Sequence, residues 1–238
     1  MHTVEIVEEK IRFGPADSLA GVLSYPAEGV AEFAALICSP HPNFGGDLDN
    51  NVVAALAQRL SAEAIVLRFN YRGVGGSRID LPAMLSVFDY WEQIEETLDY
   101  VAPLADTRAA VDELACICGN RPIVATGYSF GAIMATQVGV ADSRIRAMAG
   151  IAPPLKRVGF SFLVQCPKPT LLISGIDDFV TDPTVADRLA DLGGSHLTML
   201  RPKADHFYIG REGEVADNVE NFLAGAIGAR KESARAGA

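Results

Sequence analysis

The stretch Pro122-Ile123-Val124-Ala125-Thr126-Gly127-Tyr128-Ser129-Phe130-Gly131 decides the fold of this 238-residue chain. Its first residues are apolar and favour a strand, whereas the residues that follow, to Val140, favour a helix. Ser129 therefore lies at a sharp strand-to-helix turn, where the flanking glycines let the two elements pass close to it. A serine held out at such a turn can act as a nucleophile. The pentapeptide alone also fits an ordinary glycine-rich turn, so the rest of the chain has to supply the partners of a nucleophile.

Strand and helix patterns alternate on both sides of this turn. Residues 3–13 and 19–25 predict two antiparallel strands joined by a Gly14-Pro15-Ala16-Asp17 turn. Strands that alternate with helices are typical of a mostly parallel sheet covered on both faces. The expected fold class is therefore α/β, a three-layer sandwich around a sheet of about eight strands. The other expected strands cover residues 33–38, 64–69, 122–126, 145–151, 170–175 and 196–200, and the expected helices cover 51–60, 130–141, 183–192 and 214–227.

The segment 78–120 is longer than a minimal strand–helix–strand crossover needs. It predicts two helical segments with a break near Pro103, and it is the candidate for a small cap or rim over the site. We expect residues 1–228 to form one domain, because neither a repeat nor a linker divides them. Residues 229–238 are small and polar, which predicts a flexible C-terminal tail.

A serine nucleophile requires a base that takes its proton and a third group that orients the base. Of the four histidines, His206 follows the last expected strand, and loops at the carboxyl ends of parallel strands build such sites. The orienting carboxylate is expected after an earlier strand, where Asp177 and Asp178 are adjacent candidates. We choose Asp177, which stands two residues after Gly175 and three before the apolar Val180. Asp178 would then point away or cap the turn.

A tetrahedral intermediate also needs two donors directed at its oxyanion. The N–H of Phe130, directly after the serine, is expected to be one of them. The glycine-containing loop after the strand at 33–38 is expected to supply the other, from Asn43 or Phe44, and we favour Asn43. His41 is expected to brace this loop. Phe44 and Tyr128 are expected to line a substrate pocket, although aromatic residues equally fill ordinary cores.

Four blocks of sequence resemble the α/β-hydrolase superfamily, and within it small bacterial serine esterases. They are HPNFGG at 41–46, NYRGVGGS at 70–77, GYSFG at 127–131, and the pair Asp177 and His206. The chain order Ser129, Asp177, His206 is the order of the triad in that superfamily. The block at 70–77 lacks the full Gly-x-Gly-x-x-Gly pattern of a nucleotide-binding loop. The long segment 78–120 departs from the compact members that have no lid, which puts the size of the substrate in question.

The resemblance implies a serine hydrolase that cleaves a carboxylic ester of small or medium acyl size, without metal or organic cofactor. Thioesterase, amidase or peptidase, lactone hydrolase and carbon–carbon bond hydrolase share this machinery, and the fold does not separate them. Aspartate-nucleophile chemistry is disfavoured because residue 129 is serine. A binding protein that keeps the fold as a scaffold is the alternative of another class.

The composition of the chain limits the classes of partner that it is expected to bind. The net charge of −10 repels phosphate backbones, so we expect a small acyl substrate and no nucleic acid. No apolar run reaches the roughly 18 residues of a membrane helix, and the N-terminus lacks the features of a signal peptide, so a cytoplasmic location without membrane association is the default expectation. The spacing of the four cysteines fits neither a zinc site nor a redox motif, which favours buried free thiols at Cys38, Cys116, Cys118 and Cys166.

Overall fold

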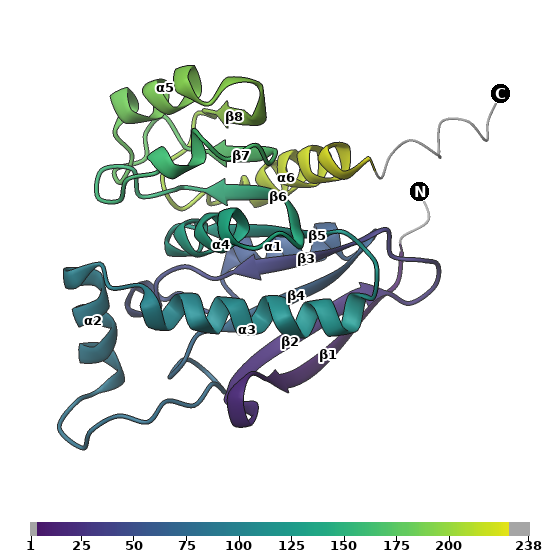
Figure 1. The fold of residues 1–238 in the computed structure, drawn as a ribbon, viewed down its shortest axis with the longest axis vertical. Coiled ribbons are helices and arrows are strands. Elements are labelled where there is room, and N and C mark those ends of the chain that lie inside the picture. The colour runs from purple at the N-terminus through teal and green to yellow at the C-terminus, as the bar shows by residue number, and fades with distance from the viewer. Residues whose placement is uncertain (1–3, 229–238) are drawn as a thin grey trace.

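The computed structural model describes residues 4–228, so the expected tail at 229–238 lies outside the described residues. An eight-stranded sheet forms the centre of the molecule, with the strand order β1-β2-β4-β3-β5-β6-β7-β8 (Figure 1). The pairs β1/β2 and β2/β4 are antiparallel, and every other neighbouring pair is parallel. The strands are β1 (Ile6–Phe13), β2 (Leu19–Pro26), β3 (Phe33–Cys38), β4 (Ala64–Asn70), β5 (Ile123–Tyr128), β6 (Ile145–Ile151), β7 (Thr170–Ile173) and β8 (Leu197–Leu200).

Two apolar clusters pack on opposite faces of this sheet. Alternation along β3 shows the division, because Leu36 belongs to one cluster and its neighbour Ile37 to the other. The cluster of Leu36 packs under α2 (Val87–Thr97), α3 (Val101–Cys118), α4 (Phe130–Ala141) and α5 (Pro183–Leu192). The cluster of Ile37 packs under α1 (Asn51–Leu60) and α6 (Glu212–Ile227). The expected α/β three-layer architecture with eight strands is confirmed.

The segment expected to form a cap divides into two unlike parts. Helix α3 lies along the sheet and packs on β3 and α4, as an ordinary crossover helix does, whereas α2 projects beyond its N-terminal end (Figure 1). The break between the two helices lies at Leu98, whose φ is 55°, and not near Pro103. Pro103 is the third residue of α3, where the missing N–H has no helical partner to lose.

Three of the four cysteines, Cys38, Cys118 and Cys166, are buried free thiols, whereas Cys116 is exposed. Positions 116 and 118 are two residues apart on α3, so the helix directs them to opposite sides. The expectation of a buried thiol at Cys116 is therefore wrong.

Among residues 4–228, no helix combines the length and the apolar character that crossing a lipid bilayer requires.

Candidate active site

Ser129 stands at the junction of β5 and α4 in a backbone conformation that non-glycine residues rarely adopt. Its φ is 55° and its ψ is −114°, and its N–H donates to the carbonyl of Ile151 on the neighbouring strand at 2.8 Å. Such strain persists only where the surroundings impose it, and it is concentrated at functional sites. The turn expected from the sequence is present, and it holds the serine at the carboxyl edge of the sheet.

Close backbone packing explains the two glycines that flank the serine. A Cβ atom built on Gly131 would lie 2.1 Å from the carbonyl oxygen of Cys38, and one built on Gly127 would lie 2.1 Å from that of Gly131. No side chain fits at either position without displacing the main chain. The first turn of α4 is thereby pressed against the end of β3, which brings the loop after β3 next to Ser129.

A continuous chain of contacts joins three side chains from three loops. Ser129 Oγ is 3.1 Å from Nε2 of His206, and Nδ1 of His206 is 3.1 Å from each carboxylate oxygen of Asp178. Asp178 and His206 are both buried, at 5% and 7% exposure. With Nδ1–H donating to the carboxylate, Nε2 carries the lone pair that can accept the serine proton.

The acid that contacts His206 is Asp178, and the sequence-based choice of Asp177 is wrong in this geometry. Asp177 is exposed, and its N–H donates to the carbonyl of Ala204 at 3.1 Å. The Asp178 carboxylate faces inward, where its Oδ1 also accepts from the N–H of Val180 at 2.9 Å. The tight turn after β7 thus rotates the second aspartate, not the first, toward the imidazole.

The loops that carry Asp178 and His206 meet through their main chains. A Cβ atom on Gly175 would lie 2.1 Å from the carbonyl oxygen of Ala204, so only glycine permits this approach. The carbonyl of His206 accepts from the Tyr128 hydroxyl at 2.9 Å, which ties its loop to the end of β5. The imidazole therefore has a fixed position relative to the serine beside Tyr128.

On the other side of Ser129, the loop after β3 differs from its expected arrangement. The N–H of Asn43 donates to Nδ1 of His41 at 3.2 Å, and the N–H of Phe44 donates to the carbonyl of His41 at 3.0 Å. Both candidate oxyanion donors are thus engaged in a short 3-10 turn at Pro42–Phe44, so the choice of Asn43 does not match this geometry. The Phe130 N–H is the first in α4 and has no intrahelical acceptor, and its role as an oxyanion donor stays a prediction.

His41 braces the loop, as the sequence suggested. Its ring lies between the Asn43 N–H and α2, with Nε2 3.8 Å from Oε2 of Glu95. Burial lowers the pKa of His41 to about 4, although the main-chain carbonyl of Trp91 near the ring acts in the opposite direction. A neutral ring with Nδ1 as acceptor is consistent with its bond to Asn43.

A cavity of about 620 Å³ opens over Ser129 and is mainly apolar. Phe44 and Tyr128 line it, as expected for substrate-contacting positions, whereas Asn43 is not one of the described residues in its wall. No sequence motif marks the lining residues contributed by α2, by Tyr100 before α3 and by the loop after β6. The remaining lining residues are Pro40, His41, Asn50, Asn51, Glu95, Tyr100, Ser129, Phe130, Ile133, Pro154, Lys156, Arg157, Val158, Phe179, Val180, His206 and Phe207.

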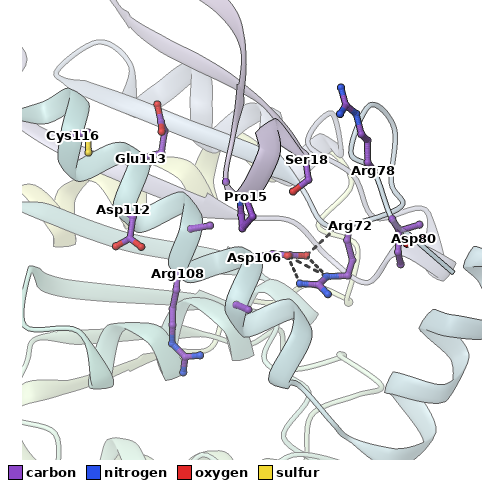
Figure 2. Close-up of a pocket in the computed structure, with 14 residues that line it drawn as sticks. Pro15, Ser18, Arg72, Arg78, Asp80, Asp106, Arg108, Asp112, Glu113 and Cys116 are labelled. Carbon is purple, nitrogen blue, oxygen red and sulfur yellow. Dashed lines mark hydrogen bonds and ion pairs between the residues drawn. The ribbon is translucent and has the colours of Figure 1, made fainter.

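A second hollow, of about 820 Å³, lies between α3 and the turn at Pro15, and it shares no residue with the cavity over Ser129 (Figure 2). Arg72 in its wall is joined to the buried Asp106 at 2.6 Å. Figure 2 shows the side chains of Arg78 and Arg108 directed away from each other, so the cations of this hollow do not converge on one point. Within the described chain, no three potential metal-binding side chains of His, Cys, Asp or Glu form a cluster.

Comparisons with known proteins agree with this architecture. Residues 41–165 match the model of the alpha/beta hydrolase family. The uncharacterized protein RP471 of Rickettsia prowazekii is 30% identical, over 79% of this chain and 77% of that protein. An alpha-beta serine hydrolase homologue from Coxiella burnetii is 26% identical with a TM-score of 0.75, over 92% of this chain and 97% of that one. The esterase Pf2001 of Pyrococcus furiosus, at 14% identity and a TM-score of 0.70 over 93% and 94% of the chains, is alike in fold alone.

Proposed function

The chain belongs to the alpha/beta hydrolase family, and from that premise we propose that it is a serine hydrolase that cleaves a carboxylic ester of small or medium acyl size. The observation that carries the proposal is the unbroken contact from Ser129 Oγ through His206 to the buried Asp178. A cavity with a mainly apolar wall directly over the serine suits an acyl group.

The proposed reaction begins when Ser129 Oγ attacks the ester carbonyl carbon and His206 Nε2 takes the hydroxyl proton. Asp178 holds the ring in the required tautomer and stabilises the imidazolium that forms. The tetrahedral intermediate then collapses, the bond to the leaving oxygen breaks, and His206 returns the proton to the departing alcohol. A water molecule, deprotonated by His206, attacks the acyl-enzyme and releases the carboxylic acid together with free Ser129.

The Phe130 N–H is the proposed first oxyanion donor, and we assign the second to the N–H of His41. Residues 40 and 42 are prolines, and the N–H groups of residues 43 to 46 all donate within the turn. The N–H of His41 has no acceptor within residues 4–228, and His41 lines the cavity beside Ser129. A structure with a covalent phosphonate on Ser129 tests this assignment by the distance from each N–H to the phosphonyl oxygen.

The test of the function is Ser129→Ala with p-nitrophenyl esters from acetate to octanoate. We expect kcat/KM to fall by about 10⁴-fold or more, because loss of the nucleophile abolishes the acyl-enzyme route. The matched control is Ser143→Ala, at an exposed serine in the turn between α4 and β6, which should retain wild-type rates. Hydrolysis by the Ser129→Ala variant at near wild-type rates would exclude the assignment.

Thioesters, amides and carbon–carbon bonds are attacked by the same machinery, so a series with one acyl group and different leaving groups identifies the bond. Labelling with a fluorophosphonate separates an enzyme from a binding scaffold. Ser129 should be labelled in the wild type and not after prior treatment with substrate-like phosphonates. A chain that takes no label and hydrolyses none of these substrates would be a non-catalytic member of the family.

A further inference from the structure

The two ends of the cavity have different surroundings, and the proposed chemistry assigns one to each part of the ester. The leaving oxygen must lie at His206, where Phe179 and Phe207 pack at 5.1 and 5.6 Å between ring centroids. The acyl group must then extend to the opposite side, past Phe130. There the wall is formed by Glu95 of α2, by Tyr100 directly before α3, by residues of α4, and by the loop after β6.

The wall on the acyl side is apolar close to the serine. Phe130 and Ile133 of α4 are 3% and 2% exposed, and the Tyr100 ring packs on Phe130 at 5.6 Å between centroids. These side chains suit the methylene groups of an acyl chain, whose burial contributes about 0.8 kcal/mol for each CH₂.

Beyond this apolar wall, three polar side chains meet at the same end of the cavity. The Arg157 guanidinium is 3.2 Å from Oε1 of Glu95, and a second guanidinium nitrogen donates to the carbonyl of Glu95. Both charges of this ion pair act on the pKa of the Tyr100 hydroxyl, which Glu95 raises and Arg157 lowers. All three residues line the cavity.

The hydrogen-bonding capacity of this group is only partly used. Tyr100 is 7% exposed, and within residues 4–228 its hydroxyl has no hydrogen-bond partner. The hydroxyl oxygen is not among the fully buried atoms, so it retains some accessible surface. Burial raises the pKa of Tyr100 to about 12, which keeps the hydroxyl protonated as a donor near neutral pH. Within residues 4–228 no hydrogen bond ends on Oε2 of Glu95, whose 3.8 Å distance from His41 Nε2 is too long for one. The group therefore offers one donor and one acceptor to the contents of the cavity.

We propose that Tyr100, Glu95 and Arg157 form a specificity subsite for a hydroxyl group on the acyl chain, so that the substrate is an ester of a hydroxy acid. This inference rests on the proposed esterase function. A hydroxyl accepts from Tyr100 and donates to Glu95 at once, which uses both free positions. Because Glu95 and Arg157 already pair with each other, neither a carboxylate nor an ammonium group meets an unpaired opposite charge there.

The experiment compares ethyl esters that differ only in the hydroxyl, with ethanol as the common leaving group and hydrolysis followed by pH-stat titration. The pairs are ethyl 3-hydroxybutanoate with ethyl butanoate, and ethyl 3-hydroxyhexanoate and ethyl 6-hydroxyhexanoate with ethyl hexanoate. For at least one pair, we expect kcat/KM to favour the hydroxy ester by about tenfold or more, because the plain ester leaves the Tyr100 hydroxyl and the Glu95 carboxylate without that partner.

The variants Tyr100→Phe and Glu95→Ala each remove one hydrogen-bonding group of the subsite. Each should lower that preference by at least about threefold. Because the preference is a ratio of two esters on the same enzyme, partial misfolding cancels from it. The matched controls are Tyr90→Phe and Glu96→Ala, at positions on α2 outside the cavity wall, and both should keep the wild-type preference.

The possible results test the hydroxyl subsite and the esterase function separately. Hydrolysis that depends on Ser129 but shows no preference in any pair overturns the subsite and leaves the esterase function standing. A preference that survives both Tyr100→Phe and Glu95→Ala places hydroxyl recognition elsewhere and also overturns the subsite. Absence of any Ser129-dependent hydrolysis contradicts the proposed function itself.

Discussion

Asp178 orients the imidazole of His206 through bonds that a neutral amide cannot reproduce. In an Asp178→Asn variant, the amide no longer stabilises an imidazolium, and its NH₂ group favours the wrong tautomer of the ring. We therefore expect kcat to fall by about 10³- to 10⁴-fold while the chain remains folded. The measurement is p-nitrophenyl ester hydrolysis at pH 7 to 8.

Asp177→Asn is the matched control, because the same substitution is made one position earlier on an exposed side chain. Its kcat should stay within about threefold of the wild type, since the contact of Asp177 with Ala204 uses only the main chain. A greater loss at position 177 than at position 178 would reverse the assignment of the acid.

His41 makes stability depend on pH, because burial lowers its pKa from 6.5 to about 4. As the pH falls below about 6.5, the unfolded chain binds a proton at this position while the folded chain does not. Folded stability is therefore lost between about pH 6.5 and pH 4, and it is unaffected by His41 above that range. The loss between pH 7 and pH 5 should be about 2 kcal/mol.

Urea unfolding of the wild type and of His41→Asn at pH 7 and at pH 5 measures the contribution of His41 to this loss of stability. Asparagine retains an oxygen that can accept from the Asn43 N–H but does not titrate. The variant should lose about 2 kcal/mol less stability than the wild type on acidification. Equal losses in the two proteins would show that other groups cause the acid sensitivity.

The junction between β5 and α4 depends on its glycines more than on any side-chain contact. Gly131→Ala would drive a Cβ atom onto the carbonyl of Cys38, and we expect it to lower the free energy of unfolding by about 3 kcal/mol or more. Gly225→Ala is the matched control, because Gly225 lies in α6 with nothing within 4 Å of the added atom. That substitution should raise stability by up to about 1 kcal/mol. Similar thermal midpoints for both variants would contradict the packing argument.

The elements could be predicted from the sequence because each carries its own periodicity and its own boundary signals. Pro103 does not mark the helix break that its sequence position suggests, since proline is tolerated in a first helical turn as well as at a break. The choice between Asp177 and Asp178 depended on main-chain bonds of the turn after β7, which involve Ala204 on another loop. Glu95 and Tyr100 carry no motif, so only the packing of α2 and α3 against the site identifies them.

Both apolar clusters include residues of the five strands β3 to β7, so the molecule is expected to unfold as a single unit although its core has two halves. Leu36 and Ile37 are adjacent in β3 and face opposite clusters, so neither face can lose its packing while the other keeps the sheet intact. Helix α6 covers one face, and Trp91, the one tryptophan of the sequence, is buried on the other. Fluorescence therefore reports on the face opposite to α6.

Leu223→Ala removes a fully buried side chain of α6, on the face away from Trp91. We expect a loss of about 2 to 5 kcal/mol, with equal shifts in the Trp91 fluorescence and the far-ultraviolet circular dichroism transitions. Leu114→Ala, on α3 and the opposite face, is the matched substitution. The double variant should show the sum of the two losses to within about 0.5 kcal/mol, because the side chains share no contact through the sheet. In the Leu223→Ala variant, the dichroism transition could shift while the Trp91 fluorescence transition stays in place. That result would mean that the two faces unfold separately.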